Sequence, residues 1–337
     1  MKRINKKAFS CPEYAQPLNV LTAILMSAIA GVTAGIFPSN YGGIFFLCIS
    51  IGLLGYVLTV SFNVLYVVFS AAVSVGVAML IGVNFPIALA ALAFVPASVV
   101  LSNCVRKRKF LTPTVAAETV ALISFAAIFA LFLYILMGEE FTSTVSGVFT
   151  EYKAYAEATL NKANSMYPIE KAIPIDDLNE MVTIMMMLLP SIAILLCMLV
   201  CYCAAKVLRL AASLCSNDSL FRGGIWPLSV SVHSSIAFFL TFIVSIFSGG
   251  RGVVFYSALT FAVILLPVQA IVGFKLLFGK RGFMRNGSFT FGKVFLLVAF
   301  VYFLITNPIM TVILAAMFTV YCNIKLLILE KLKKSAE

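Results

Sequence analysis

Glu118 is the residue whose type and place in this chain most strongly suggest chemistry. It is the only acidic residue within the long apolar runs of the sequence. An ionisable side chain in such surroundings is costly, so it usually faces a protein interior or a water-filled cavity. Glu118 therefore predicts a proton or cation site. The alternative is an ion pair at the end of the run with the preceding basic residues, which are Arg106, Lys107, Arg108 and Lys109.

A second polar group lies near the start of the apolar run 226–248 and contains Ser231, His233 and Ser234. Histidine changes its charge near neutral pH, so His233 could bind a proton beside these hydroxyls. A hydrogen-bonded interior histidine without a ligand is the more ordinary interpretation. Together with Glu118, these three residues are the predicted candidates for binding a substrate or an ion.

Motifs of enzymes and metal sites fail on spacing or context. His233 is the only histidine, which excludes a site with several histidine ligands. The segment "GFKLLFGKRG" departs from a phosphate-binding loop in its glycine spacing and in Arg281. Cys197 and Cys201 lie one helical turn apart, but no further ligand accompanies them, and we interpret them as small apolar side chains. We predict no catalytic residue, no metal, no cofactor and no enzymatic activity.

The apolar runs themselves determine the predicted fold class. The chain has 337 residues, of which 62% are hydrophobic and 11% charged, far from the balance of a soluble domain. Runs long enough to span a membrane predict an all-α, polytopic transmembrane helical bundle of about ten spans. Asn307-Pro308 predicts a tight hairpin between the last two. The runs are 18–37, 44–61, 63–83, 85–104, 114–137, 181–205, 226–248, 253–278, 291–306 and 308–328.

The basic residues predict how the spans are oriented. With the N-terminus in the cytoplasm, every Lys and Arg except Lys153, Lys162, Lys171 and Arg251 falls on the cytoplasmic side, as the positive-inside rule requires. Both termini are therefore predicted to be cytoplasmic, with Arg106 to Lys109 as topology anchors. The predicted partner of these charges is the lipid bilayer. Nucleic acid is not expected, because the basic run lacks interleaved aromatic residues.

The same topology divides the chain into three parts: a five-span half at 1–137, an extracytoplasmic loop at 138–180 and a second five-span half with a basic tail at 181–337. The loop is acidic, and Phe141, Val145, Val148, Tyr152 and Tyr155 recur at helical spacing. This pattern predicts an amphipathic helix on the outer surface. The helix is either a lid or docking element, or a cover for exposed span ends.

The first apolar run contains a stripe of small residues. Small side chains at this spacing allow the backbone of another helix to approach closely. The approaching helix can belong to the same chain or to a partner. The residues of the stripe are Ala23, Ser27, Ala30, Gly31, Ala34 and Gly35.

Several segments resemble a known family. "SAIAGVTAG", "RKRK", "TPTVAAET", "MMLLPSIAILL", "AAKVLRL" and "FRGGIWPLSVSV" are similar to the DUF2232 or YybS-like group of bacterial membrane proteins. The N-terminal half of that group is thought to be related to the substrate-capturing S components of energy-coupling-factor transporters. The resemblance implies that the face of Ala30 and Ala34 contacts a transmembrane coupling subunit. S components lack the C-terminal extension present here.

Two functions from different classes follow as hypotheses. The first is a transporter-type integral membrane protein that binds or translocates an unknown small-molecule substrate in a bacterial cell (plasma) membrane. The second is a non-catalytic membrane scaffold that binds envelope proteins during cell-envelope or spore assembly. Glu118 and the polar run around His233 favour the first hypothesis, and the amphipathic outer helix suits the second.

Overall fold

Helices make up all the regular structure that can be described in this chain. The computed structural model describes residues 17–36, 41–60, 63–107, 109–165, 175–215, 229–249, 252–278, 283 and 291–336, and no strand occurs within them. The predicted all-α fold is confirmed. Each predicted apolar run coincides with helical structure in the described segments.

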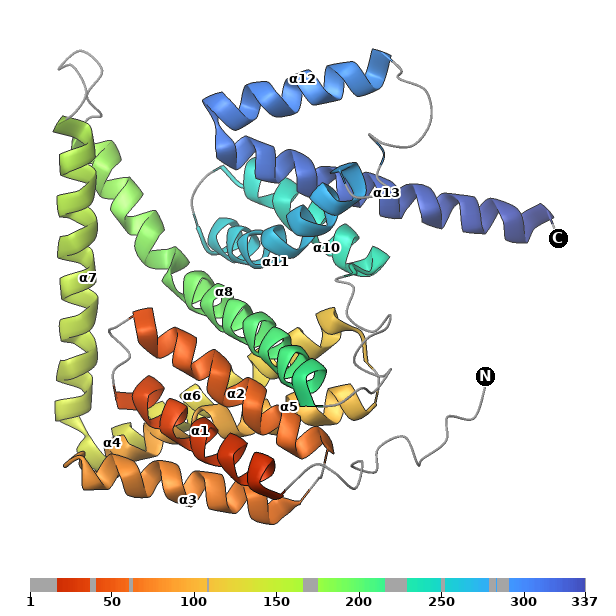
Figure 1. The fold of residues 1–337 in the computed structure, drawn as a ribbon. Helices are drawn as coiled ribbons and strands as arrows, with labels where there is room; N and C mark the ends of the chain where they lie inside the picture. The colour runs from red at the N-terminus through yellow and green to blue at the C-terminus, as the bar shows by residue number, and fades with distance from the viewer. Residues whose placement is uncertain are drawn as a thin grey trace. The chain divides into compact units, whose positions relative to one another are not determined.

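The helices fall into two compact units, of which the first comprises Met1–Met186 and Ala193–Pro227. This unit contains the helices coloured red to green in Figure 1. They are α1 (Pro17–Ile36), α2 (Tyr41–Val60), α3 (Val64–Leu80), α4 (Phe85–Ala88), the 3₁₀ helix η2 (Leu89–Leu92), α5 (Phe94–Arg106), α6 (Leu111–Met137), α7 (Glu139–Ser165) and most of α8 (Ile175–Cys215).

Hydroxyl groups connect α1 to its neighbours in this unit. Ser50 on α2 donates its Oγ–H to the carbonyl oxygen of Ser27 at 2.7 Å. Ser74 on α3 donates to the carbonyl oxygen of Ala28 at 3.3 Å. Helices in a membrane associate through such hydrogen bonds and through close packing, because lipid tails remove the hydrophobic driving force. α1 is therefore held by α2 and α3 on one face.

The small-residue stripe of α1 packs within the chain. Ser27, Ala30 and Gly31 are buried. A Cβ atom at Gly31 would overlap the ring of Phe94 and lie 3.2 Å from the carbonyl oxygen of Ala91. The helix that approaches this stripe thus belongs to the same chain. The side chains of Ala23, Ala34 and Gly35 lie outside the described set.

The predicted fourth span is not one regular helix. Residues 85–106 form α4, then η2, and then α5 after Ala93. Pro86 lies in the first turn of α4, where its missing N–H costs no hydrogen bond. The tighter 3₁₀ winding occurs where Ala91 meets Gly31. Pro96, in the first turn of α5, has no N–H to donate to the carbonyl of Leu92, which explains why the span does not continue as one regular α-helix.

α6 and α7 are joined by Gly138 alone. Its φ of 54° lies in the left-handed region that favours glycine.

In Figure 1, α7 runs across the direction of α3 rather than along it. The predicted helix of the outer loop is confirmed, although its apolar face stays largely uncovered: Val148 is 62% exposed and Tyr155 71% exposed. The choice between a lid or docking element and a cover for span ends stays a prediction.

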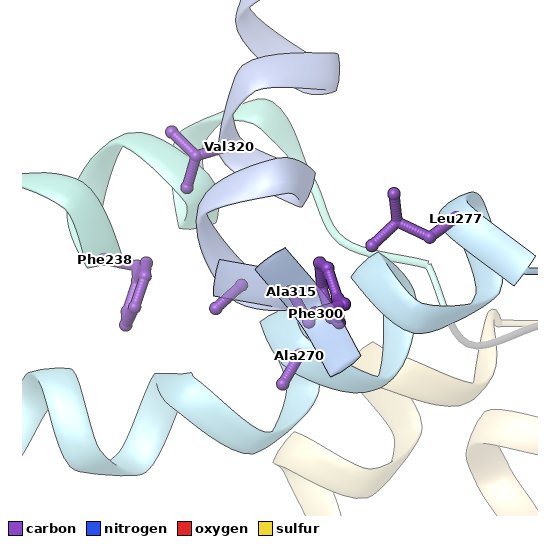
Figure 2. Close-up of a cluster of buried hydrophobic side chains, with 7 residues drawn as sticks. Phe238, Ala270, Leu277, Phe300, Ala315 and Val320 are labelled. Atoms are coloured by element: carbon purple, nitrogen blue, oxygen red, sulfur yellow. The ribbon is translucent and has the colours of Figure 1, made fainter. Parts of the chain in front are cut away.

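The second unit comprises Met187–Ile192 and Leu228–Glu337. Its core gathers one side chain or more from each of its four helices, as Figure 2 shows. The helices are α10 (Val232–Phe247), α11 (Val253–Phe278), α12 (Phe291–Thr306) and α13 (Pro308–Ala336). The buried cluster consists of Phe238, Ala270, Leu277, Phe300, Ala315, Ala316 and Val320.

Backbone contact between α11 and α13 is especially close. A Cβ atom at Gly273 would overlap the backbone carbonyl of Ala315 and lie 2.9 Å from Oγ1 of Thr319. The absence of a side chain at Gly273 lets the two helices approach to this distance. Gly273 therefore determines the packing of the two longest helices of this unit.

The predicted hairpin at Asn307 is confirmed. α12 ends at Thr306 and α13 begins at Pro308, and the two helices pack against each other. Asn307 caps α13, because its Oδ1 accepts a hydrogen bond from the backbone N–H of Met310 at 3.3 Å. Proline in the first turn of α13 suits the new helix, whose first N–H groups have no partner within it.

Six described helical segments are long and apolar enough to cross a membrane, which supports the prediction of a membrane protein. They are Gly43–Val60, Phe85–Arg106, Leu111–Met137, Val182–Ala212, Val253–Phe278 and Pro308–Leu329; shorter apolar helices are Val64–Leu80, Val232–Phe247 and Lys293–Thr306. The total of ten spans and the side of each terminus stay predictions.

The compact units do not follow the predicted three-part division. α7 and most of α8 group with the first unit, and its second segment ends at Pro227. The boundaries after residues 137 and 180 were derived from membrane sidedness, which is a different property from packing. The division by topology therefore also stays a prediction.

Candidate functional site

Glu118 lies on the buried face of α6, about two turns after the helix begins at Leu111. Its side chain is fully buried, with 0% exposure. The connection from α5 to α6 consists of residues 107–110, so the end of α5 and the start of α6 lie together. The buried residues of α6 are Leu111, Thr114, Val115, Glu118, Thr119 and Leu122, all within its first half.

Two other helices supply the polar atoms nearest to the Glu118 carboxyl. The thiol of Cys201 on α8 lies beside it, and Cys104 on α5 is close enough to interact with it electrostatically. α8 is held near α2, because a Cβ atom at Gly52 would lie 2.6 Å from Cβ of Val207. Glu118 thus lies among α5, α6 and α8 of the first unit.

The carboxyl has no hydrogen-bond partner in the described structure. Neither Oε1 nor Oε2 meets one that satisfies both distance and angle criteria, and the Cys201 thiol beside the carboxyl is only a weak donor. The hydroxyl of Thr119 is already engaged, since it donates to the carbonyl oxygen of Val115 at 2.8 Å. Glu118 is therefore a buried acidic group without a hydrogen-bond partner in the first unit.

The alternative to a binding site is an ion pair between Glu118 and the basic residues 106–109. No such pair is found among the described residues of this run. Lys107 and Lys109 are exposed, as is Arg106 at the end of α5, and Glu118 forms no hydrogen bond with any of them. Arg108 lies outside the described residues. A buried ionised carboxylate without a partner costs several kcal/mol, whereas an unsatisfied neutral polar group costs about 1–3 kcal/mol. A proton or a bound cation at Glu118 would avoid the larger of these two costs.

Metal ligands do not gather around this carboxyl. Within the residues that the structure describes, no three His, Cys, Asp or Glu side chains are grouped closely enough to hold a metal ion. Cys48, Cys104, Cys197, Cys201, Cys203 and Cys322 carry free thiols. Among the described side chains, Glu118 is thus a single carboxyl group with two thiols as neighbours.

The other predicted site residues belong to the second unit and start a helix. Ser231 is the N-cap of α10, and its Oγ accepts a hydrogen bond from the backbone N–H of Ser234 at 3.1 Å. Ser231 and His233 are exposed. Capping explains Ser231 without a ligand, whereas Ser234 takes part in the cap through its backbone N–H alone. The structure does not place Ser231, His233 and Ser234 around an interior site.

Sequence reasoning missed the polar group that does lie inside the second unit, Gln269 on α11. Ser235 donates its hydroxyl to Oε1 of Gln269 at 3.2 Å and accepts from Nδ2 of Asn323 at 2.8 Å. The backbone carbonyl of Gln269 accepts from Thr319 Oγ1 at 2.7 Å. These four residues, from α10, α11 and α13, are called the amide cluster below. A search of apolar runs for amides, and not only for charges, would have found Gln269.

No protein-family model matches the chain, and no curated protein or solved structure gives a significant match. The class of the protein therefore rests on its own features, namely an all-helical fold with apolar helices of membrane-spanning length and a buried carboxyl that lacks a hydrogen-bond partner.

Proposed function

We propose that this protein is an integral membrane protein of transporter type, which moves a small solute across a bacterial plasma membrane through a bundle of ten spans with both termini in the cytoplasm. The observation that supports this proposal most is Glu118, a fully buried carboxyl with no hydrogen-bond partner. A helix bundle needs no such group for stability, since an apolar side chain of similar size would pack without the cost of desolvation. Acidic residues within membrane spans commonly mark ion or substrate pathways.

The proposed membership of the DUF2232 or YybS-like group suggests one mode of transport, in which α1 contacts a coupling subunit. Ala30 is buried and the neighbouring Gly31 packs against Phe94 within the same chain. A partner helix at this face would have to displace α5 and η2. The packing therefore favours a transporter that works without a coupling subunit docked at Ala30.

Helices at all ten predicted runs support the proposed topology. Single cysteines introduced at Gly138 and Lys109, in a variant without native cysteines, test it by labelling intact cells with a membrane-impermeant maleimide. We expect labelling at residue 138 and none at residue 109. The reverse pattern, or labelling of both positions, would contradict the five-span first half.

Transport is tested with purified protein in liposomes that are exposed to a mixture of labelled metabolites. We expect uptake of at least one solute by the natural protein and none by Glu118→Gln. Glu151→Gln is the matched control, because Glu151 lies exposed on α7 and its replacement should leave uptake unchanged. If both variants transport as well as the natural protein, Glu118 has no role in transport.

The exposed apolar face of α7 favours a second function, the scaffold for envelope or spore assembly. A protein partner on this face would cover Val148 and Tyr155. Val148→Ser with Tyr155→Ser should then abolish copurification of envelope proteins, whereas Glu118→Gln should not affect it. A stable partner lost only in the α7 variant, with no transport by the natural protein, would establish the scaffold over the transporter.

A further inference from the structure

We propose that the cation bound at Glu118 is a proton, and that this carboxyl couples transport to proton movement. The inference rests on the proposed function for its role in transport, but the binding of a proton at Glu118 is testable without any solute. It follows from the chemistry of the atoms that surround the carboxyl and from those that are missing there.

Hard metal cations need more oxygen ligands than this site offers. Mg²⁺ and Ca²⁺ take six or more oxygen atoms. The neighbours of the Glu118 carboxyl are the thiols of Cys201 and Cys104. The Thr119 hydroxyl donates its hydrogen to the Val115 carbonyl and could add at most one further oxygen ligand. One carboxyl group and one hydroxyl fall short of six oxygen atoms, whereas a proton requires only a single carboxylate oxygen.

A soft metal fits no better. Thiolates bind such ions, but no group of three potential ligands forms among the described residues. Glu118 and the two thiols are therefore not arranged as a set of three ligands. The weak donor and acceptor capacity of a thiol suits a neutral carboxylic acid beside Cys201 more than it suits a metal ion.

The charged groups around Glu118 leave the proton as the neutralising cation. The titratable groups that face it are Cys201 from α8 and Cys104 from α5. Lys107 and Lys109 interact electrostatically with the thiol of Cys104, and neither shows such an interaction with Glu118. Both lysine side chains are exposed. Neither of these two lysines is thus placed to compensate an ionised Glu118.

The position of Glu118 also gives a proton a short route. It lies seven residues after Leu111, where α6 begins, which is about 10 Å along the helix axis. Thr114 lies one turn closer to that end on the same buried face. Its hydroxyl donates to the carbonyl oxygen of Phe110 at 2.8 Å. A polar step therefore exists between the carboxyl and the membrane face from which α6 starts.

An apolar carbodiimide tests the site directly. Dicyclohexylcarbodiimide partitions into the membrane, where a protonated carboxyl adds across one of its C=N bonds and no group is lost. The full-length protein in liposomes is treated with it over a range of pH, digested, and the adduct at each carboxyl is quantified by mass spectrometry. Glu118→Gln is the variant that removes the reactive group.

We expect labelling of Glu118 at neutral pH to be at least roughly tenfold stronger than labelling of Glu151, because an exposed glutamate is almost fully ionised there. Labelling should fall as the pH rises, and sodium or magnesium salts should not protect the residue. No adduct at Glu118 at any pH, or protection by either metal cation, would overturn the proposal.

A second measurement separates this inference from the proposed function. Liposomes that contain a pH-sensitive dye are given a pH gradient and a solute mixture. Solute uptake with proton flux that is lost in Glu118→Gln and after carbodiimide treatment supports both. Labelling of Glu118 without any solute or proton flux leaves the proton site intact and contradicts transport. Solute uptake that persists in Glu118→Gln contradicts proton coupling and leaves transport intact.

Discussion

The first unit buries a carboxyl whose oxygens have no hydrogen-bond partner, whereas the second buries a glutamine whose side-chain oxygen accepts from a helix α10 hydroxyl and whose backbone carbonyl accepts from a helix α13 hydroxyl. Glu118 has only thiols close by. Gln269 interacts with Ser235 and Thr319, and Asn323 extends the cluster through Ser235. Within the amide cluster, Nε2 of Gln269 is a buried atom that lacks a hydrogen-bond partner.

The two units therefore differ in what their buried polar side chains contribute to an otherwise apolar helix bundle. Hydrogen bonds between helices stabilise their association by roughly 0.6 kcal/mol on average and up to about 1.7 kcal/mol, so the amide cluster contributes to the fold of the second unit. An isolated carboxyl contributes nothing comparable and costs desolvation. We infer that the second unit uses its buried polar groups for assembly and the first unit uses Glu118 for binding.

The largest expected loss in the free energy of unfolding comes from disturbing the contact between α11 and α13, which brings the amide cluster together. Gly273→Ala would place Cβ against the backbone carbonyl of Ala315, which cannot rotate away. We expect a loss of about 1–3 kcal/mol or more in the free energy of unfolding, seen as a lower midpoint in thermal unfolding in detergent. Gly76→Ala is the control, because nothing lies within 4 Å of its Cβ position. Equal midpoints for the two variants would contradict the close approach of α11 and α13.

The next effect tests the amide cluster itself. Gln269→Leu leaves the hydroxyl of Ser235 without its acceptor in a buried place. We expect a loss of about 1–2 kcal/mol, measured by the same thermal unfolding. Pairing it with Ser235→Ala in a double-mutant cycle isolates the interaction. A coupling energy near zero would show that Gln269 and Ser235 do not stabilise the second unit together.

A smaller effect is expected at the start of α10. Ser231→Ala removes the side chain that accepts the N–H of Ser234, at a cost of about 1 kcal/mol. Ser231→Asp restores a cap and should recover most of the loss. His233→Ala, at an exposed position, should change stability by less than about 0.5 kcal/mol. A change in transport without a change in stability in His233→Ala would reinstate His233 as a functional residue.

Replacement of Glu118 is expected to have the smallest effect on stability and the largest effect on the proposed transport. Glu118→Leu removes a carboxyl that has no hydrogen-bond partner and retains an apolar side chain, so the free energy of unfolding should stay within about 0.5 kcal/mol or rise. Uptake should be abolished. A marked loss of stability in this variant would indicate that Glu118 has a structural partner, and the contrast between the two units would fail.

Much of the fold could be predicted from the sequence, because the positions of apolar runs follow directly from composition. Asn307-Pro308 predicted the hairpin, and the spacing of Val148 and Tyr155 predicted the helix of the outer loop. The break at residues 89–92 was missed, although Pro96, which has no N–H to donate to the carbonyl of Leu92, is a signal for it in the sequence. The contact between Ala91 and Gly31 could not be predicted, because the two residues are far apart in the sequence.

The site was only partly predictable for the same reason. An acidic residue in an apolar run identifies Glu118 without further information. Its thiol neighbours on α5 and α8 follow only from tertiary packing. Ser231 and His233 were selected for their residue types, but a residue type does not say whether a side chain caps a helix, as Ser231 does, or faces the interior, as Ser235 does.

α6 has a further consequence for how the protein responds to its bilayer. Its buried residues end at Leu122, although the helix continues to Met137. The 27 residues extend about 40 Å, whereas the hydrocarbon layer is about 30 Å thick. A helix longer than the layer tilts or thickens the lipid around it. Because the buried residues of α6 all lie at the end that bears Glu118, a change in bilayer thickness would tilt the helix about that end. We therefore expect the protein to sense the lipid composition of its membrane.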